Sequence, residues 1–97
     1  MILVRYVFQA KWGMVGEVVA VFKESQKILG EQFGRSRVLT DLSGPLMTVV
    51  QEIEVESLAE WERRRSEIYS RPRYQELQAR AAALIESGRA EFYTIEA

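Results

Sequence analysis

Apolar residues recur at every second position along residues 1–10, which is the spacing of a β-strand. Both faces of this predicted strand carry apolar side chains, and the second face also carries Arg5 and Gln9. We expect other parts of the protein to pack on both faces of such a strand, with the second face in the more polar environment. The first face consists of Ile2, Val4, Tyr6, Phe8 and Ala10.

Between residues 14 and 29 the apolar spacing changes to that of an amphipathic helix. Lys11-Trp12-Gly13 separates the two patterns, and its glycine suits a turn. Gly30 or Gly34 can end the helix. The apolar stripe consists of Val15, Val18, Val19, Phe22 and Leu29.

Residues 35–42 and 46–55 alternate again and predict two further strands. Three turn-forming residues, Ser43-Gly44-Pro45, lie between them, so we expect an antiparallel hairpin. One face of the second strand carries Met47, Val49, Gln51, Ile53 and Val55.

A second helical region begins with Ser57-Leu58-Ala59-Glu60, which has the pattern of a capping box. In such a box the serine hydroxyl caps a helix amide and the glutamate reaches back. We expect this helix to extend to about Tyr69. Pro72 interrupts it, because proline suits the first turn of a new helix better than a helix interior.

The last part of the chain predicts a third helical stretch and a final strand. An apolar stripe runs from Arg73 and is expected to end at Ser87-Gly88. Residues 91–96 alternate and predict the strand. The stripe consists of Tyr74, Leu77, Ala81, Leu84 and Ile85.

The predicted order is β-α-β-β-α-β, with the second helical region divided at Pro72. This is the ferredoxin-like plan of the α+β class, in which residues 1–97 form one domain with a four-stranded antiparallel sheet and the helices on one face. The other sheet face is apolar enough that we predict a homodimer packed sheet against sheet. The alternative is a monomer whose second face is kept polar by Arg5, Gln9, Arg37 and Glu52.

The amino-acid composition excludes most common catalytic centres. The 97-residue chain is 47% hydrophobic and 28% charged, the balance of a folded protein. Having no histidine and no cysteine, it has no imidazole base, thiolate nucleophile, disulfide or cysteine-held metal. Asp41 is the sole aspartate, which excludes an EF-hand loop. We therefore expect no metal and no cofactor, and we identify no catalytic residue or acid–base dyad.

Charge and hydropathy exclude further classes. The formal net charge is −1, and glutamates interleave with Arg63-Arg64-Arg65, so we expect no nucleic-acid partner. The longest apolar runs, such as residues 18–22, are too short for a membrane span. The sequence does not open with a basic segment and a long apolar run, so no signal peptide is expected. These features predict a cytoplasmic protein.

Several stretches resemble the dimeric α+β barrel superfamily. Lys11-Trp12-Gly13, which ends the first strand, and Thr40-Asp41-Leu42-Ser43-Gly44-Pro45 carry this resemblance. Three further stretches look most similar to bacterial NIPSNAP-type small proteins. These are Val50-Gln51-Glu52-Ile53-Glu54, Ser57-Leu58-Ala59-Glu60-Trp61-Glu62 and Gly88-Arg89-Ala90-Glu91-Phe92-Tyr93.

The resemblance implies a sheet-to-sheet dimer, with a pocket between the sheet and the helices of each protomer. It selects no activity, because the superfamily includes cofactor-independent monooxygenases, haem-degrading enzymes, lactone isomerases and ligand domains of transcription regulators. Haem-degrading relatives hold iron with a histidine, which this chain lacks. Monooxygenase relatives use tryptophan and asparagine, and this chain has Trp12 and Trp61 but no asparagine.

Seven residues are candidates for ligand binding on chemical grounds. Arg5 can hold a carboxylate with two hydrogen bonds, or pair with a glutamate across a dimer interface. Trp12 is placed in a loop, where binding groups concentrate, although capping of a core edge is the commoner role. Trp61 has the spacing of a core residue. The full set is Arg5, Tyr6, Trp12, Phe22, Gln51, Trp61 and Tyr93.

Two classes of function remain. One is a dimeric protein that binds a small hydrophobic ligand or a protein partner. The other is a cofactor-independent enzyme of the monooxygenase type that acts on an aromatic or hydrophobic substrate. The pocket residues serve both classes, and the scarcity of titratable groups favours binding.

Overall fold

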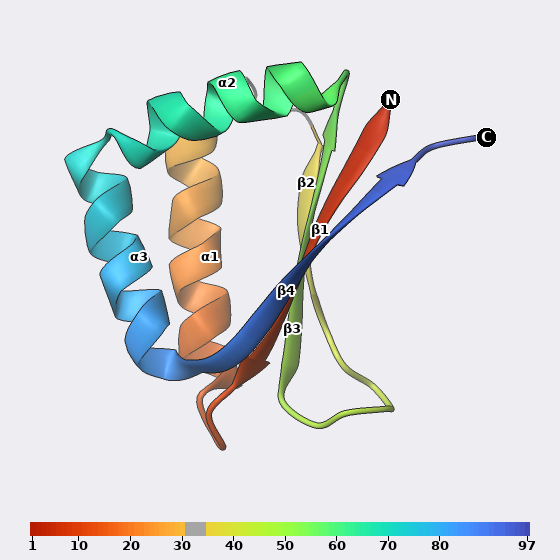
Figure 1. Cartoon of the computed structure of the whole chain (residues 1–97). Coiled ribbons are helices and arrows are strands. Elements are labelled where there is room, and N and C mark those ends of the chain that lie inside the picture. Colours follow the sequence, from red (N-terminus) through yellow and green to blue (C-terminus); the bar gives the residue numbers. More distant parts are fainter. Residues whose placement is uncertain (31–34) are drawn as a thin grey trace.

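Three helices cover one face of a four-stranded antiparallel sheet (Figure 1). The computed structural model describes residues 1–30 and 35–97. The predicted ferredoxin-like α+β fold is confirmed. In chain order the elements are β1 (Ile2–Ala10), α1 (Val15–Leu29), β2 (Ser36–Thr40), β3 (Thr48–Val55), α2 (Leu58–Tyr69), α3 (Pro72–Leu84) and β4 (Ile85–Thr94).

The strands lie in the order β2-β3-β1-β4, so β1 and β3 form the middle of the sheet. Tyr6 on β1 lies opposite Gln51 on β3 and Ala90 on β4. Because side chains alternate between faces, this register places Tyr6 and Gln51 side by side beneath the helices.

The core between sheet and helices consists of two clusters. One includes Val4, Ile53 and Trp61 and lies under α2. The other includes Val49 and Leu77 and lies under α1 and α3. Along β1 and β3, Tyr6 and Gln51 come between the residues of the two clusters, so the middle of the helix-covered face carries a phenol and an amide.

The expected helix boundaries are largely confirmed. Gly30 ends α1 with a φ of +59°, a conformation that favours glycine, while the other expected helix end, Gly34, lies outside the described residues. The Ser57 hydroxyl accepts a hydrogen bond from the Glu60 amide at 3.1 Å, which confirms the cap of α2. The Glu60 carboxylate does not complete the predicted box. It accepts hydrogen bonds from the side chains of Arg63 and Arg64.

The expected boundary between the third helical stretch and the last strand is wrong. The helix α3 ends at Leu84 and β4 begins at Ile85, so Ser87-Gly88 belongs to the strand. Ser87 and Gly88 pair with Gln9 and Phe8 of β1. The pairing partners on β1 outweigh the turn preference of a serine–glycine pair, which is a purely local signal.

The second sheet face carries a row of ion pairs that crosses all four strands. Glu52 on β3 contacts Arg37 on β2 at 2.6 Å and Arg5 on β1 at 3.2 Å. Arg5 also contacts Glu91 on β4 at 3.3 Å. Apolar side chains share this face on both sides of the row: Leu3, Val7, Leu39, Val50 and Tyr93.

No helix in residues 1–30 or 35–97 is long and apolar enough to cross a membrane.

Candidate functional site

A cavity of about 440 Å³ lies between the sheet and the helices. Its floor comes from β1 and β3, its roof from α1 and α3, and its remaining wall from the end of α2 and the start of β4. It opens at the gap between the two core clusters, where Tyr6 and Gln51 replace aliphatic residues.

Aromatic rings form two groups in the cavity lining. Tyr6 and Phe8 lie nearly parallel, with ring centroids 6.0 Å apart and an angle of 12°. Phe8 packs at an angle against Phe22 of α1, at 5.4 Å. On the opposite wall, Tyr69 and Tyr74 stack at 5.5 Å across the bend at Pro72. These two aromatic groups give the cavity flat walls that suit a planar ligand.

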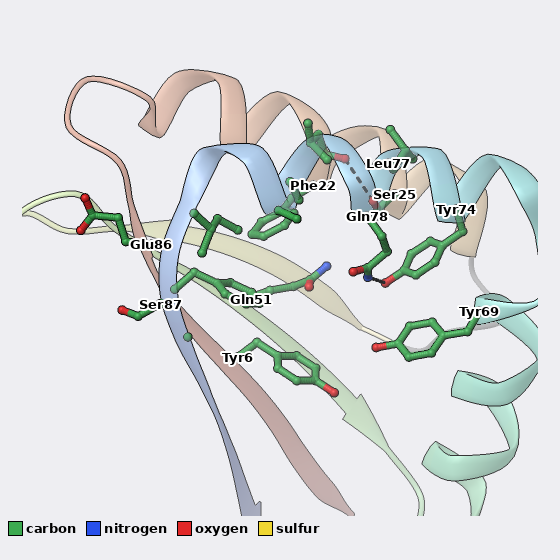
Figure 2. Close-up of a pocket in the computed structure, with 16 residues that line it drawn as sticks. Tyr6, Phe22, Ser25, Gln51, Tyr69, Tyr74, Leu77, Gln78, Glu86 and Ser87 are labelled. Atoms are coloured by element: carbon green, nitrogen blue, oxygen red, sulfur yellow. Dashed lines mark hydrogen bonds between the residues drawn. The ribbon is translucent and has the colours of Figure 1, made fainter.

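Neutral polar groups gather at one part of the cavity. Figure 2 shows the amides of Gln51 and Gln78 and the hydroxyls of Tyr69 and Tyr74 directed toward the same region. The Gln78 amide donates a hydrogen bond to the Tyr74 hydroxyl at 2.9 Å. The groups provide both donors and acceptors without a formal charge.

The phenols of Tyr74 and Tyr6 stay protonated over a wide pH range. Burial raises the pKa of Tyr74 to about 12, with the hydrogen bond from Gln78 acting in the opposite direction. Burial, and then the neighbouring Tyr69, also raise the pKa of Tyr6, while Arg65 lowers it. The hydroxyls are therefore available as hydrogen-bond donors at neutral pH.

Gln51 differs from the other buried polar residues of the described chain. Ser25 donates a hydrogen bond to the Val21 carbonyl oxygen, and Glu52 pairs with two arginines. Gln51 is only 8% exposed, and within residues 1–30 and 35–97 its amide makes no hydrogen bond. Its amide atoms are not among the fully buried side-chain atoms without a partner, so they reach the open space of the cavity.

The structure brings together four of the seven candidate residues. Tyr6, Phe22 and Gln51 line the cavity. Trp61 borders a smaller recess of about 20 Å³ that Tyr6 and Gln51 also border, and its ring lies 6.1 Å from that of Tyr6. For these four residues a role in ligand binding remains a prediction.

The other three candidates lie elsewhere. Arg5 and Tyr93 point to the second sheet face, since they are in register with Glu52 and Leu3 of that face. Trp12 lies in the loop between β1 and α1 and is 73% exposed. These residues are not among those that line the cavity, and their role in ligand binding stays a prediction.

Sequence analysis missed six polar residues that line the cavity: Ser25, Tyr69, Tyr74, Gln78, Glu86 and Ser87. Tyr74 and Gln78 are four residues apart on α3, so they lie on one helix face. This face also carries Leu77 and Ala81, which are buried. Two polar residues at this spacing within an apolar stripe could have indicated that the helix presents polar groups to a cavity.

The site is suited to binding an uncharged ligand. Among the described residues, no group of three or more acidic side chains could hold a metal ion. Glu86, at the start of β4, is the sole charged residue that lines the large cavity in the described segments. The arrangement can enclose an apolar body, stack it between rings and hydrogen-bond a neutral polar group.

The fold is similar to that of NIPSNAP-domain proteins. An uncharacterised NIPSNAP-domain protein from Burkholderia xenovorans has a TM-score of 0.87 at 20% identity, covering 100% of this chain and 96% of that chain. A NIPSNAP family protein from Agrobacterium tumefaciens has a TM-score of 0.85 at 21% identity, covering 96% and 90%. The resemblance inferred from the sequence is thus confirmed as a likeness of fold.

More distant structural neighbours include an enzyme. SnoaB, a cofactor-independent oxygenase from Streptomyces nogalater, has a TM-score of 0.76 at 15% identity, covering 99% of this chain and 93% of that chain. No family model and no curated protein matches the sequence. At these identities the likeness concerns the fold alone, so function has to be argued from the cavity.

Proposed function

We propose that the protein binds a small, uncharged and largely aromatic molecule in the cavity between sheet and helices. The observation that carries this proposal is the volume of about 440 Å³ enclosed by aromatic rings and neutral polar groups. Ligand sites commonly have volumes of about 300–1,000 Å³ and combine an apolar lining with a few placed polar groups.

Two neighbouring alanines allow a direct test of this proposal. Ala82 lines the cavity, whereas Ala83, next to it on α3, does not, and both are exposed. We expect Ala82→Trp to fill the opening and weaken binding of the neutral fluorescent probe N-phenyl-1-naphthylamine at least about tenfold. Ala83→Trp makes the same change of residue outside the cavity and should bind the probe as the wild type does. Equal affinities in both variants would contradict the proposal.

The proposal includes a homodimer formed through the second sheet face. Apolar side chains lie on both sides of the ion-pair row, next to Glu54 and Arg89, and Leu39 and Tyr93 on this face remain 36% and 49% exposed. An apolar face of a sheet is commonly buried against a partner. Cytoplasmic residence remains a prediction from the sequence.

Sedimentation velocity tests the dimer. Leu39→Asp places an unpaired charge in the proposed interface and should shift the protein toward the monomer. Leu58→Asp is the matched control, since Leu58 is 52% exposed on α2, away from the sheet. A wild-type monomer at micromolar concentration would overturn this part of the proposal.

Cofactor-independent oxygenation is a second candidate function. Its support is the likeness of fold to SnoaB, together with the position of Trp61 beside the cavity. Oxygen uptake with a panel of aromatic hydroquinones tests it. Uptake that is lost in Ala82→Trp and kept in Ala83→Trp would favour an enzyme, and its absence in the wild type favours binding alone.

A further inference from the structure

We propose that Gln51 selects ligands that present an N–H donor beside a carbonyl acceptor, as the lactam edge of an aromatic heterocycle does. This inference rests on the proposed function, because it assumes that the cavity holds a small aromatic molecule. It adds the chemical class of that molecule and assigns its recognition to one side chain.

The first support is the state of the Gln51 side chain. The residue is more than nine-tenths buried, it lines the cavity, and its amide has no hydrogen-bond partner in the described part of the chain. Figure 2 shows its amide directed into the open space toward Gln78. Buried polar groups in folded proteins nearly always have a partner, so an amide open to a cavity points to a ligand that completes it.

The second support is the rigid placement of this amide. Gln51 lies on the central strand β3, paired with Tyr6 on one side and Val38 on the other. Its strand neighbours Val49 and Ile53 are fully packed in the two core clusters. A polar group mounted on a central strand is held more firmly than one on a loop, which favours geometric selection.

The chemistry of a carboxamide decides which ligand edge fits. Gln51 offers one carbonyl acceptor and an NH₂ donor on the same planar group. A ligand edge with an adjacent N–H and C=O can therefore make two parallel hydrogen bonds with it, as glutamine does with the edge of adenine. A ligand with a carbonyl alone satisfies one half of the amide and leaves the other half buried and unpaired.

The rest of the cavity restricts the ligand to an uncharged ring system. The rings of Tyr6, Phe8 and Phe22 lie beside Gln51 and suit a planar body. No arginine or lysine of the described chain lines the large cavity, and Glu86 is acidic. A carboxylate ligand in the large cavity would thus lose its hydration without a cation in the cavity lining, since Arg65 borders the smaller recess beside Tyr6 and Gln51.

Two isosteric probes test the inference. Quinolin-2(1H)-one carries N–H beside C=O, and coumarin has the same shape with a ring oxygen in place of the N–H. We expect isothermal titration calorimetry to show quinolin-2(1H)-one binding the wild type at least about tenfold more tightly than coumarin. In Gln51→Met, which keeps the length of the side chain and removes the amide, the two affinities should become equal.

Gln78→Met is the matched control, because Gln78 also lines the cavity but its amide already binds the Tyr74 hydroxyl. This variant should keep the preference for quinolin-2(1H)-one. A preference that survives in Gln51→Met would overturn the assignment to Gln51.

The comparison of probes in the wild type needs no variant and separates this inference from the proposed function. Equal binding of quinolin-2(1H)-one and coumarin would refute the inference and leave the ligand-binding function intact. If neither probe binds, the inference fails. If N-phenyl-1-naphthylamine does not bind either, the proposed function fails with it.

Discussion

The ring of Phe8 occupies the space that a side chain at position 88 would need. Phe8 and Gly88 lie opposite each other on β1 and β4, and a Cβ atom on Gly88 would lie 2.6 Å from Cδ1 of Phe8. The glycine lets the ring lie flat over β4 while it stacks with Tyr6 and packs against Phe22. The shape of the cavity therefore depends on a missing side chain in the edge strand.

We predict that Gly88→Ala destabilises the protein by about 1–3 kcal/mol, the usual cost of overpacking. The displaced Phe8 ring should also enter the cavity and weaken binding of N-phenyl-1-naphthylamine. Gly16→Ala is the control, since a Cβ there meets no atom within 4 Å on the helix α1, and it should stabilise by up to about 1 kcal/mol. Urea unfolding measures both changes, and similar effects of the two substitutions would contradict the packing argument.

Removing the buried amide should stabilise the empty protein. Gln51→Met replaces an unpartnered amide by an apolar side chain of similar length, so we expect a gain of about 1 kcal/mol in the free energy of unfolding. The measurement is urea unfolding without ligand at a fixed protein concentration. A loss of stability would mean that the amide is satisfied in the folded protein. If Gln51→Met gains stability and loses ligand selectivity, Gln51 serves binding at the expense of stability.

Substitution of the neighbouring residue Glu52 should lower the free energy of unfolding instead of raising it. Glu52→Leu removes the carboxylate that pairs with Arg5 and Arg37, and we expect a loss of about 1–3 kcal/mol because these partners are then incompletely satisfied. Glu54→Leu is the control on the same face of β3, since Glu54 is less buried and lies two residues from the row. Denaturant unfolding of both variants tests this, and equal stabilities would mean that the row contributes little.

The Tyr74 hydroxyl should lose its proton at a higher pH than an ordinary tyrosine does. Its pKa is raised by burial from 10.0 to about 12, so the folded protein holds this proton more tightly than the unfolded chain does. The corresponding stabilisation is fully present below pH 10 and is lost as the pH rises from about 10 to about 12. Absorbance of tyrosinate against pH, compared between the wild type and Tyr74→Phe, measures this. Loss of a transition near pH 10 in the variant would contradict the assignment.

The order of elements could be predicted because each has a clear apolar period and a recognisable end. Ser57 and Pro72 marked the starts of α2 and α3, where local chemistry decides the structure. The start of β4 could not be predicted, because the role of Gly88 depends on the distant ring of Phe8. A serine–glycine pair is a turn signal when only its own neighbours are considered.

The candidate site could be predicted only where it depends on the local sequence pattern. Tyr6 and Gln51 belong to the apolar faces of their strands, so alternation alone placed them under the helices. Tyr69 and Tyr74 come together through the bend at Pro72, and a linear pattern does not reveal such a contact. The side of the sheet on which Tyr93 lies follows from the register of β4 with β1, which local sequence does not determine.

The row formed by Arg37, Glu52, Arg5 and Glu91 has two positive and two negative side chains, which are paired within a single protomer. A second copy that covers this face would meet, in this row, charges that are already paired, and it would need to bring no counter-charge to the row. Mobile ions weaken attraction between unpaired opposite charges and have little to screen in such a row. The association constant of the dimer should then hardly change with ionic strength.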